Sequence, residues 1–184
     1  MNIKKGMKNQ MTKNPFEVLH ASNETYGQGG VAFAEQITEI GKFYHCRTIL
    51  DFGCGKGKLA EQLKRNFVEA LCYDPFIEKF NQWPAVNYDM LVSTDVLEHI
   101  KEDELNDTFM KMKSVDPVVM FHNVSNRKAD QVLPNGENAH ATIKGSVWWE
   151  RSLSFAFPDY WIDCLNYDPK EQATRYVMVK RYVE

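Results

Sequence analysis

Three glycines at two-residue spacing form the clearest chemical motif of this 184-residue chain. Gly53, Gly55 and Gly57 stand between an apolar segment, residues 48–52, and a segment of helical pattern. Glycine lets the backbone approach a ligand closely, and the first amides of a helix can bind a polar group. Asp74 ends the next apolar segment, about 20 residues on, where a carboxylate can accept hydrogen bonds from both hydroxyls of a ribose. The pattern predicts a site for a nucleoside-containing cofactor.

The spacing of the glycines separates two classes of cofactor. A dinucleotide-binding loop has the pattern Gly-x-Gly-x-x-Gly, whereas this chain has Gly-x-Gly-x-Gly, with Lys58 at the position of the last glycine. The spacing therefore disfavours an NAD site. A tight turn without a ligand is disfavoured too, because strand, loop and distal acid occur together.

A second group of titratable residues follows the buried apolar segment at 88–93. Asp95, Glu98 and His99 have the i, i+3, i+4 spacing that places side chains on one face of a helix. His122 stands at the end of another predicted strand. Open α/β sheets bind ligands at the carboxyl ends of their strands, so we expect Asp95, His99 and His122 to rim one pocket.

Two chemistries suit this second group. His99, His122 and His140 are candidate general bases, since a neutral imidazole can accept the proton of a hydroxyl or amine, and Glu98 is a candidate catalytic residue beside them. In the alternative, Asp95, Glu98, His99 and His140 bind a divalent metal. A third interpretation gives these residues only capping, loop or cofactor-supporting roles.

Segments of strand and helix character alternate along the chain. Strands are expected at 47–52, 68–73, 88–93, 117–122, 160–167 and 174–183, and helices at 31–42, 58–66, 102–115 and 148–155. Such alternation predicts a Rossmann-like, doubly wound α/β sheet. The last two strands are joined by a short turn at Asp168-Pro169, which allows a hairpin but not a parallel crossover. We therefore expect a mixed sheet, mostly parallel with an antiparallel C-terminal strand.

Size and composition favour a single domain over residues 1–184, with residues 1–14 as a solvated tail. No apolar run approaches the roughly 20 residues of a membrane span, and no secretory signal is evident. The net charge of −3 disfavours a nucleic-acid partner. The four cysteines form no Cys-x-x-Cys pair, so a zinc cluster is not expected, and reduced thiols suit a cytoplasmic location.

The loop Asp51-Phe-Gly-Cys-Gly-Lys-Gly57, taken with Asp74, resembles that of class I S-adenosylmethionine-dependent methyltransferases over most of the chain, from about Tyr26 onward. The resemblance implies S-adenosylmethionine as the cofactor. It assigns the cofactor-binding residues as follows: Asp51, Gly53, Cys54, Gly55 and Gly57 in the loop, Asp74 at the ribose, Pro75 and Phe76 beside the adenine, Tyr26 in a segment that closes over the cofactor, and Asp95 facing the methyl donor.

One stretch departs from the family pattern. The family usually has a helix and a third strand after the ribose-binding acid, with a polar residue at the adenine, whereas residues 74–88 are too few for both. This unit must be compressed or lost, so the residues at the adenine edge stay unassigned.

The resemblance implies a methyltransferase acting on a small molecule or sugar-containing metabolite, with O-methylation slightly favoured over N-methylation. Residues 133–140 with Trp148-Trp149 are similar to bacterial and phage methyltransferases, some of them encoded near glycan-modifying enzymes. A runner-up is a metal-assisted RNA 2′-O-methyltransferase, whose Glu-x-x-Glu-His helix is similar to residues 95–99, with Asp95 in place of the first glutamate. The remaining alternative is a non-catalytic cofactor-binding or activator subunit. The chain is expected as a monomer or homodimer.

Overall fold

The computed structural model describes residues 13–168 and 172–181. Its strands are β1 (Thr48–Phe52), β2 (Glu69–Tyr73), β3 (Met90–Thr94), β4 (Val119–Ser125), β5 (Tyr160–Asp168) and β6 (Ala173–Lys180). Its α-helices are α1 (Pro15–Ser22), α2 (Ala34–Phe43), α3 (Lys58–Leu63), α4 (Leu105–Lys113) and α5 (Ser146–Ala156). Short 3₁₀ turns are η1 (Gly29–Phe33), η2 (Glu78–Phe80), η3 (Leu97–His99) and η4 (Glu102–Glu104).

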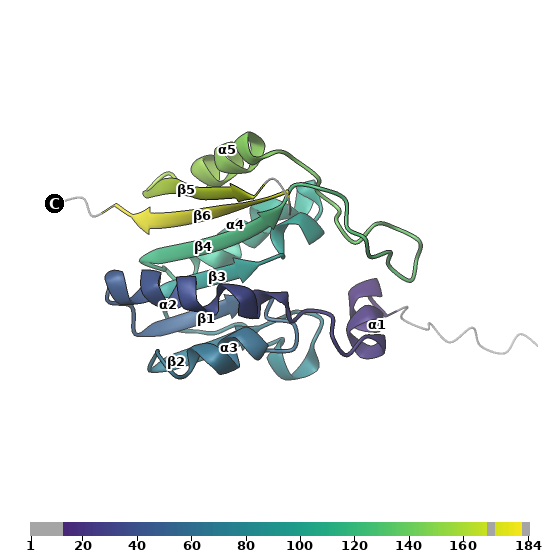
Figure 1. Cartoon of the computed structure of the whole chain (residues 1–184), viewed down its shortest axis with the longest axis horizontal. Helices are drawn as coiled ribbons and strands as arrows, with labels where there is room; N and C mark the ends of the chain where they lie inside the picture. The colour runs from purple at the N-terminus through teal and green to yellow at the C-terminus, as the bar shows by residue number, and fades with distance from the viewer. Residues whose placement is uncertain (1–12, 169–171, 182–184) are drawn as a thin grey trace, which may run out of the picture.

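The strands form one sheet in the order β2-β1-β3-β4-β6-β5. The first four run parallel, and β6 runs antiparallel to both β4 and β5. The expected Rossmann-like mixed sheet with an antiparallel C-terminal strand is confirmed. Figure 1 shows α2 and α3 in front of the sheet. Pro169 of the predicted turn, residues 1–12 of the predicted tail and residues 182–183 of the last predicted strand lie outside the described residues.

Alternate residues of the central strands supply two cores, one on each face of the sheet. Ile49 of β1 joins a cluster with the inner residues of α2 and α3, whereas Leu50 joins a cluster with those of α4 and α5. Both side chains are fully buried. This period-two alternation in apolar strands is what a sheet covered by helices on both faces requires.

A third, smaller cluster lies beyond the carboxyl ends of the parallel strands. Asn14 caps α1 by accepting a hydrogen bond from the Phe16 amide. Leu19 of α1 packs with Leu133 and Ala139, which belong to the long connection between β4 and α5. Figure 1 shows α1 and this connection, in green, extending past the strand ends. They form the rim of the site described below.

Two details of the sheet differ from or refine the sequence expectation. β4 continues to Ser125, so His122 lies inside the strand and not at its end. The apolar pattern predicts a strand end at His122, since Asn123 and Ser125 are polar, but both of these residues are buried in the structure. The segment between Asp74 and β3 contains only the turn η2, so the expected loss of a helix and strand is confirmed, and β2 is left as an edge strand.

Candidate active site

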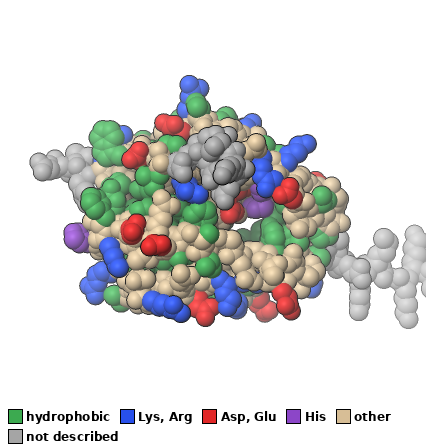
Figure 2. Space-filling view, in the orientation of Figure 1, with side chains coloured by type: hydrophobic (Ala, Val, Ile, Leu, Met, Phe, Trp, Pro, Cys, Tyr) green, Lys and Arg blue, Asp and Glu red, His purple; other side chains and the backbone are tan. Residues whose placement is uncertain are grey.

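A cavity of about 690 Å³ lies at the carboxyl ends of β1, β2 and β3. Its walls come from the glycine loop, residues 26–30, the ribose-side acid Asp74, the region from η3 to α4, α1, and the connection after β4. Figure 2 shows hydrophobic side chains around a hollow on the side of the molecule where α1 lies. Nine of the ten predicted cofactor residues line this cavity: Tyr26, Asp51, Gly53, Cys54, Gly55, Asp74, Pro75, Phe76 and Asp95.

The glycine loop requires glycine at the positions that the motif specifies. Gly53, Gly55 and Gly57 all have positive φ, at 73°, 53° and 75°. A Cβ on Gly55 would lie 2.4 Å from the carbonyl oxygen of Gly27, so the loop and the preceding segment could not pack together. Gly57 does not line the cavity. It caps α3 in the left-handed conformation and turns the chain into the helix.

Asp74 is tied to the loop by hydrogen bonds to both of its oxygens. Its Oδ2 accepts from the Gly55 amide at 3.0 Å, and its Oδ1 accepts from the Phe76 amide at 2.9 Å. Asp74 lines the cavity, although the residue is only 4% exposed. Each carboxylate oxygen has two lone-pair sites, so acceptor capacity remains for the two hydroxyls of a ribose.

Asp51 offers a further acceptor inside the cavity. Its carboxyl group is buried, and Oδ2 has no hydrogen-bond partner among the described residues. Burial raises the pKa of this carboxyl well above its usual range. A buried polar atom without a partner is costly, and an ammonium or amino group of a bound cofactor would satisfy it. The residues around the cavity thus fit the methionine, ribose and adenine parts of S-adenosylmethionine.

Aromatic side chains of α1 close the cavity, and the sequence contained no motif that identified them. Phe16 stacks on Phe76 with ring centroids 5.4 Å apart and an interplanar angle of 21°. Tyr26 contacts the His20 ring edge-on at 4.9 Å. Burial raises the pKa of Tyr26 to about 12, so its hydroxyl stays protonated. Only the tertiary packing of α1 places Phe16 and His20 at the site.

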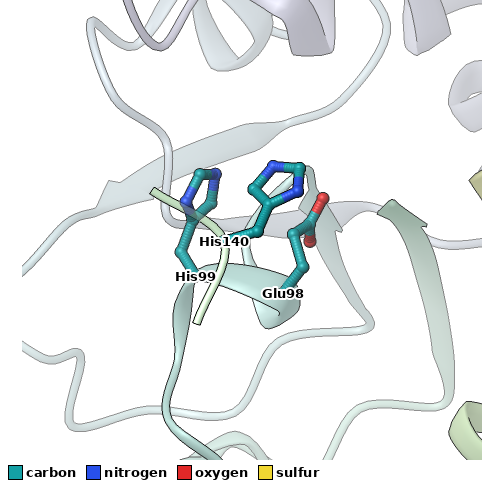
Figure 3. A group of neighbouring side chains, drawn as sticks. All are labelled: Glu98, His99 and His140. Atoms are coloured by element: carbon teal, nitrogen blue, oxygen red, sulfur yellow. The ribbon is translucent and has the colours of Figure 1, made fainter. Parts of the chain in front are cut away.

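Glu98, His99 and His140 converge, although 41 positions separate His99 from His140. One potential ligand atom of each lies within 4.8 Å of those of the others. Figure 3 shows the two imidazole rings side by side, with the Glu98 carboxyl group next to His140. The ring centroids of His99 and His140 are 4.8 Å apart. The connection after β4 brings His140 back to η3, because the amides of Ala141 and Thr142 both donate to the Glu98 carbonyl.

Hydrogen bonds to backbone carbonyls determine the tautomer of both histidines. The Nδ1 atom of His99 lies 2.7 Å from the Ala139 carbonyl oxygen, and that of His140 lies 2.6 Å from the Arg127 carbonyl oxygen. A carbonyl only accepts, so each Nδ1 carries the proton. In the neutral imidazole each Nε2 is then left with a lone pair. The pair is therefore ready to accept a proton or to bind a cation.

Burial shifts the titration of all three groups toward the uncharged form. It lowers the pKa of His99 to about 4 and lowers the pKa of His140 as well. It raises the pKa of Glu98 well above its usual range, and the nearby Asp95 carboxylate adds to the shift. Glu98 is fully buried; Oε1 accepts from the Ser125 amide at 2.9 Å, while Oε2 has no partner among the described residues.

Two of the predicted residues lie apart from this group. Asp95 lines the cavity with a positive φ of 55° and accepts a hydrogen bond from Asn123 Nδ2 at 2.6 Å, but it is not part of the group of potential metal ligands. His122 is fully buried in β4, its Nδ1 lies 2.8 Å from Ser93 Oγ, and it does not line the cavity. The expectation that His122 rims the pocket is wrong, because the strand extends past it.

Sequence reasoning also missed a row of polar residues that begins at Lys101, before η4, and continues into α4. Lys101, Glu104, Thr108 and Lys111 all line the cavity. Their spacing of three, four and three residues is the signal that could have identified one face of a helix.

None of the described helices has the length and apolarity needed to cross a membrane. No curated protein matches the sequence. The model of the family described as "Methyltransferase domain" matches residues 30–157, which is more than half of the chain.

Solved structures of methyltransferases share the fold. The methyltransferase domain of a bacterial Hen1 protein superposes with a TM-score of 0.63 at 13% identity, covering 83% of this chain and 99% of that one. A complex of DhpI with SAH gives a TM-score of 0.63 at 11% identity, covering 92% and 96%. The Burkholderia thailandensis 1,6-didemethyltoxoflavin-N1-methyltransferase gives a TM-score of 0.62 at 12% identity, covering 92% and 88%. With the cofactor loop and its acid in place, the chain belongs to the methyltransferase domain family and is an S-adenosylmethionine-dependent methyltransferase.

Proposed function

We propose that this enzyme methylates a hydroxyl oxygen of a small molecule or sugar-containing metabolite. The observation that carries the proposal is the pair of imidazoles, His99 and His140, whose Nδ1 protons are held by backbone carbonyls. His99 lines the cofactor cavity, and the His140 ring lies directly behind it at a centroid distance of 4.8 Å. Their Nε2 lone pairs suit a substrate that must lose a proton as it is methylated. Glu98 would support the pair as an uncharged neighbour and would not accept the proton itself, since burial raises its pKa well above the usual range.

The cofactor supplies an electrophilic methyl group on a sulfonium sulfur. As the acceptor oxygen bonds to the methyl carbon, the carbon–sulfur bond breaks and its electrons stay on sulfur. The proton of the acceptor hydroxyl goes to Nε2 of His99 or His140. Because burial lowers the pKa of His99 to about 4, its imidazole carries only the Nδ1 proton at pH 7, and its Nε2 is unprotonated. Orientation inside the cavity would supply much of the remaining rate.

The size and charge of the site favour a small acceptor. Pockets for small ligands commonly range over roughly 300–1,000 Å³, and this cavity of about 690 Å³ must also hold the cofactor. The net charge of −3 offers no general attraction for a nucleic acid. One structural relative, the 1,6-didemethyltoxoflavin-N1-methyltransferase, holds 1,6-didemethyltoxoflavin together with S-adenosylhomocysteine. Tyr26 and the N-terminal α1 would close over the bound ligands.

A second candidate places a divalent cation between Glu98, His99 and His140. Metal-bound histidines typically donate their other ring N–H to a carbonyl or carboxylate, which is the arrangement of both imidazoles here. The unpartnered Oε2 of Glu98 would supply the third ligand atom. Such a cation would orient two acceptor oxygens and lower the pKa of a hydroxyl. Another structural relative is the small RNA methyltransferase HEN1, so a short RNA belongs among the acceptors tested.

A labelled-methyl screen tests the proposal. The purified chain is incubated with radiolabelled S-adenosylmethionine and a library of hydroxylated metabolites, sugars and short RNAs, with and without EDTA. Transfer to a small hydroxyl acceptor supports O-methylation, and transfer that persists in EDTA supports proton acceptance by histidine alone. Loss of transfer in EDTA, with recovery on adding Mn²⁺ or Mg²⁺, supports the cation. Labelling only at nitrogen, or only of RNA, would contradict the first proposal.

A further inference from the structure

The cavity has one wall that the cofactor loop and the histidine pair do not account for. Lys101 precedes η4, Glu104 ends η4, and Thr108 and Lys111 lie on α4. All four line the cavity, and we call them the α4 polar face. Thr108 and Lys111 are half-buried, whereas Glu104 is exposed at the cavity rim. Four polar residues along one wall of a cofactor cavity suggest recognition of a polar group.

The α4 polar face lies where the sheet is shortened. β2 is the edge strand, and the 15 residues between Asp74 and Met90 contain only η2. Among the described residues, no strand therefore lies beyond β2 to supply a polar residue at that end of the cavity. Lys111 of α4 reaches Tyr73 at the end of β2 from this side.

Contacts between α4 and β2 hold the polar face in position. Lys111 Nζ donates a hydrogen bond to the Tyr73 hydroxyl and lies 4.3 Å from the centroid of the Tyr73 ring. Trp83, from the shortened segment, donates through Nε1 to Ser114 Oγ at 3.0 Å. Tyr73 immediately precedes Asp74, so these contacts place the polar face next to the carboxylate assigned to the ribose.

The Thr108 hydroxyl group already uses its hydrogen as a donor within the helix. Its Oγ1 donates to the Glu104 carbonyl oxygen at 3.1 Å, so its hydrogen is engaged within the helix. The oxygen keeps its lone pairs and can only accept a hydrogen bond from a ligand while this bond lasts. The Glu104 carboxylate, one turn earlier, is also an acceptor. The exocyclic amino group of adenine is a donor that two such acceptors would recognise.

We infer that Thr108, with Glu104 one turn before it, recognises the amino edge of the cofactor's adenine in place of the missing third strand. Asp74 would hold the ribose and Phe76 would flank the base, so the base edge would face α4. The inference rests on the cofactor class alone and is independent of the acceptor. It predicts that a cofactor analogue with an oxo group at this edge binds poorly. The oxo oxygen, a hydrogen-bond acceptor, would then face the acceptor oxygens of Thr108 and Glu104.

Calorimetry with two product analogues tests this inference without any turnover. S-adenosylhomocysteine carries the amino group, and S-inosylhomocysteine carries an oxo group at the same position. Thr108→Val keeps the shape of the side chain but removes the acceptor. We expect it to weaken S-adenosylhomocysteine binding about five- to tenfold, the range of one net hydrogen bond, and to change S-inosylhomocysteine binding less than about twofold. Glu104→Gln should likewise reduce the preference for the amino ligand.

Asp107→Asn is the matched control, because Asp107 is exposed on α4 and does not line the cavity. It should change neither affinity, and thermal melting should show all variants folded. Equal weakening of both ligands by Thr108→Val would indicate a structural role for Thr108 and overturn the inference. Unchanged affinity for both ligands in Thr108→Val and Glu104→Gln would show that α4 does not contact the base, and would also overturn it.

Discussion

The Asp74 carboxylate accepts a hydrogen bond from the Gly55 amide at 3.0 Å, so the ribose-side acid and the glycine loop form one rigid unit. Two residues 19 positions apart thus determine each other's placement. A change at either residue is expected to affect cofactor binding through both.

Asp74→Ala should weaken S-adenosylmethionine binding by at least tenfold. A hydrogen bond to a charged group contributes about 1.5–3 kcal/mol, and the variant also frees the Gly55 amide. Isothermal calorimetry measures the effect directly. Asp89→Asn is a suitable control, because Asp89 accepts from the amides of Arg47 and Thr48 at the opposite end of β1. It should lower stability and leave affinity unchanged; unchanged affinity in Asp74→Ala would remove Asp74 from the site.

Gly55→Ala should abolish cofactor binding and lower stability. The new Cβ would lie 2.4 Å from the Gly27 carbonyl oxygen, in addition to the strain of a φ of 53°. Gly136→Ala separates these two causes, since Gly136 has a φ of 87° and nothing within 4 Å of an added Cβ. We expect Gly136→Ala to cost only the backbone strain, on the order of 1 kcal/mol. Equal affinity for the cofactor in Gly55→Ala and the wild type would show that the packing of Gly27 on the loop is dispensable.

His140→Ala should abolish turnover, by a factor of about 10²–10⁴ if the imidazole is the general base. Cofactor affinity should stay within about twofold, because none of the hydrogen bonds that hold Asp74 involves His140. Steady-state rates and calorimetry on the same preparation distinguish the two effects. His45→Ala, at an exposed histidine between α2 and β1, should change neither. Full activity in His140→Ala would end both roles proposed for this residue.

The buried His122 should make the protein sensitive to acid. Burial lowers its pKa to about 3, whereas a histidine in an unfolded chain takes up a proton near 6.5. Between these values the unfolded chain binds more protons, so the free energy of unfolding falls as the pH falls from 6.5 toward 3. At pH 5 the loss from this residue is about 2 kcal/mol relative to pH 7.

Urea unfolding at pH 7 and pH 5 measures this acid sensitivity. His122→Asn keeps a polar partner for Ser93 and does not titrate, so its loss of stability between the two pH values should be about 2 kcal/mol smaller than that of the wild type. Its absolute stability at pH 7 is not the readout, because the substitution also changes packing. An identical loss in both proteins would mean that His122 does not stay neutral in the folded state.

Local patterns in the sequence determined the part of the site that binds the cofactor. The glycine loop, Asp74 and the alternation of strands and helices are encoded in short segments, because a parallel sheet requires apolar strands and a sharp turn requires glycine. The short turn between the last two strands likewise predicted an antiparallel strand at the C-terminal end of the sheet, whereas the strand order comes from the structure alone. Residues 74–88 were correctly recognised as too short for a further helix and strand.

Only the tertiary structure decided which residues surround the methyl acceptor. His140 meets His99 because two amides after it bind the Glu98 carbonyl, a contact between distant segments that no spacing specifies. His122 is excluded because β4 buries the polar residues that follow it. Phe16 and the α4 polar face reach the cavity through packing of α1 and α4. Such contacts depend on which surfaces meet in three dimensions, and this information is absent from any short stretch of the chain.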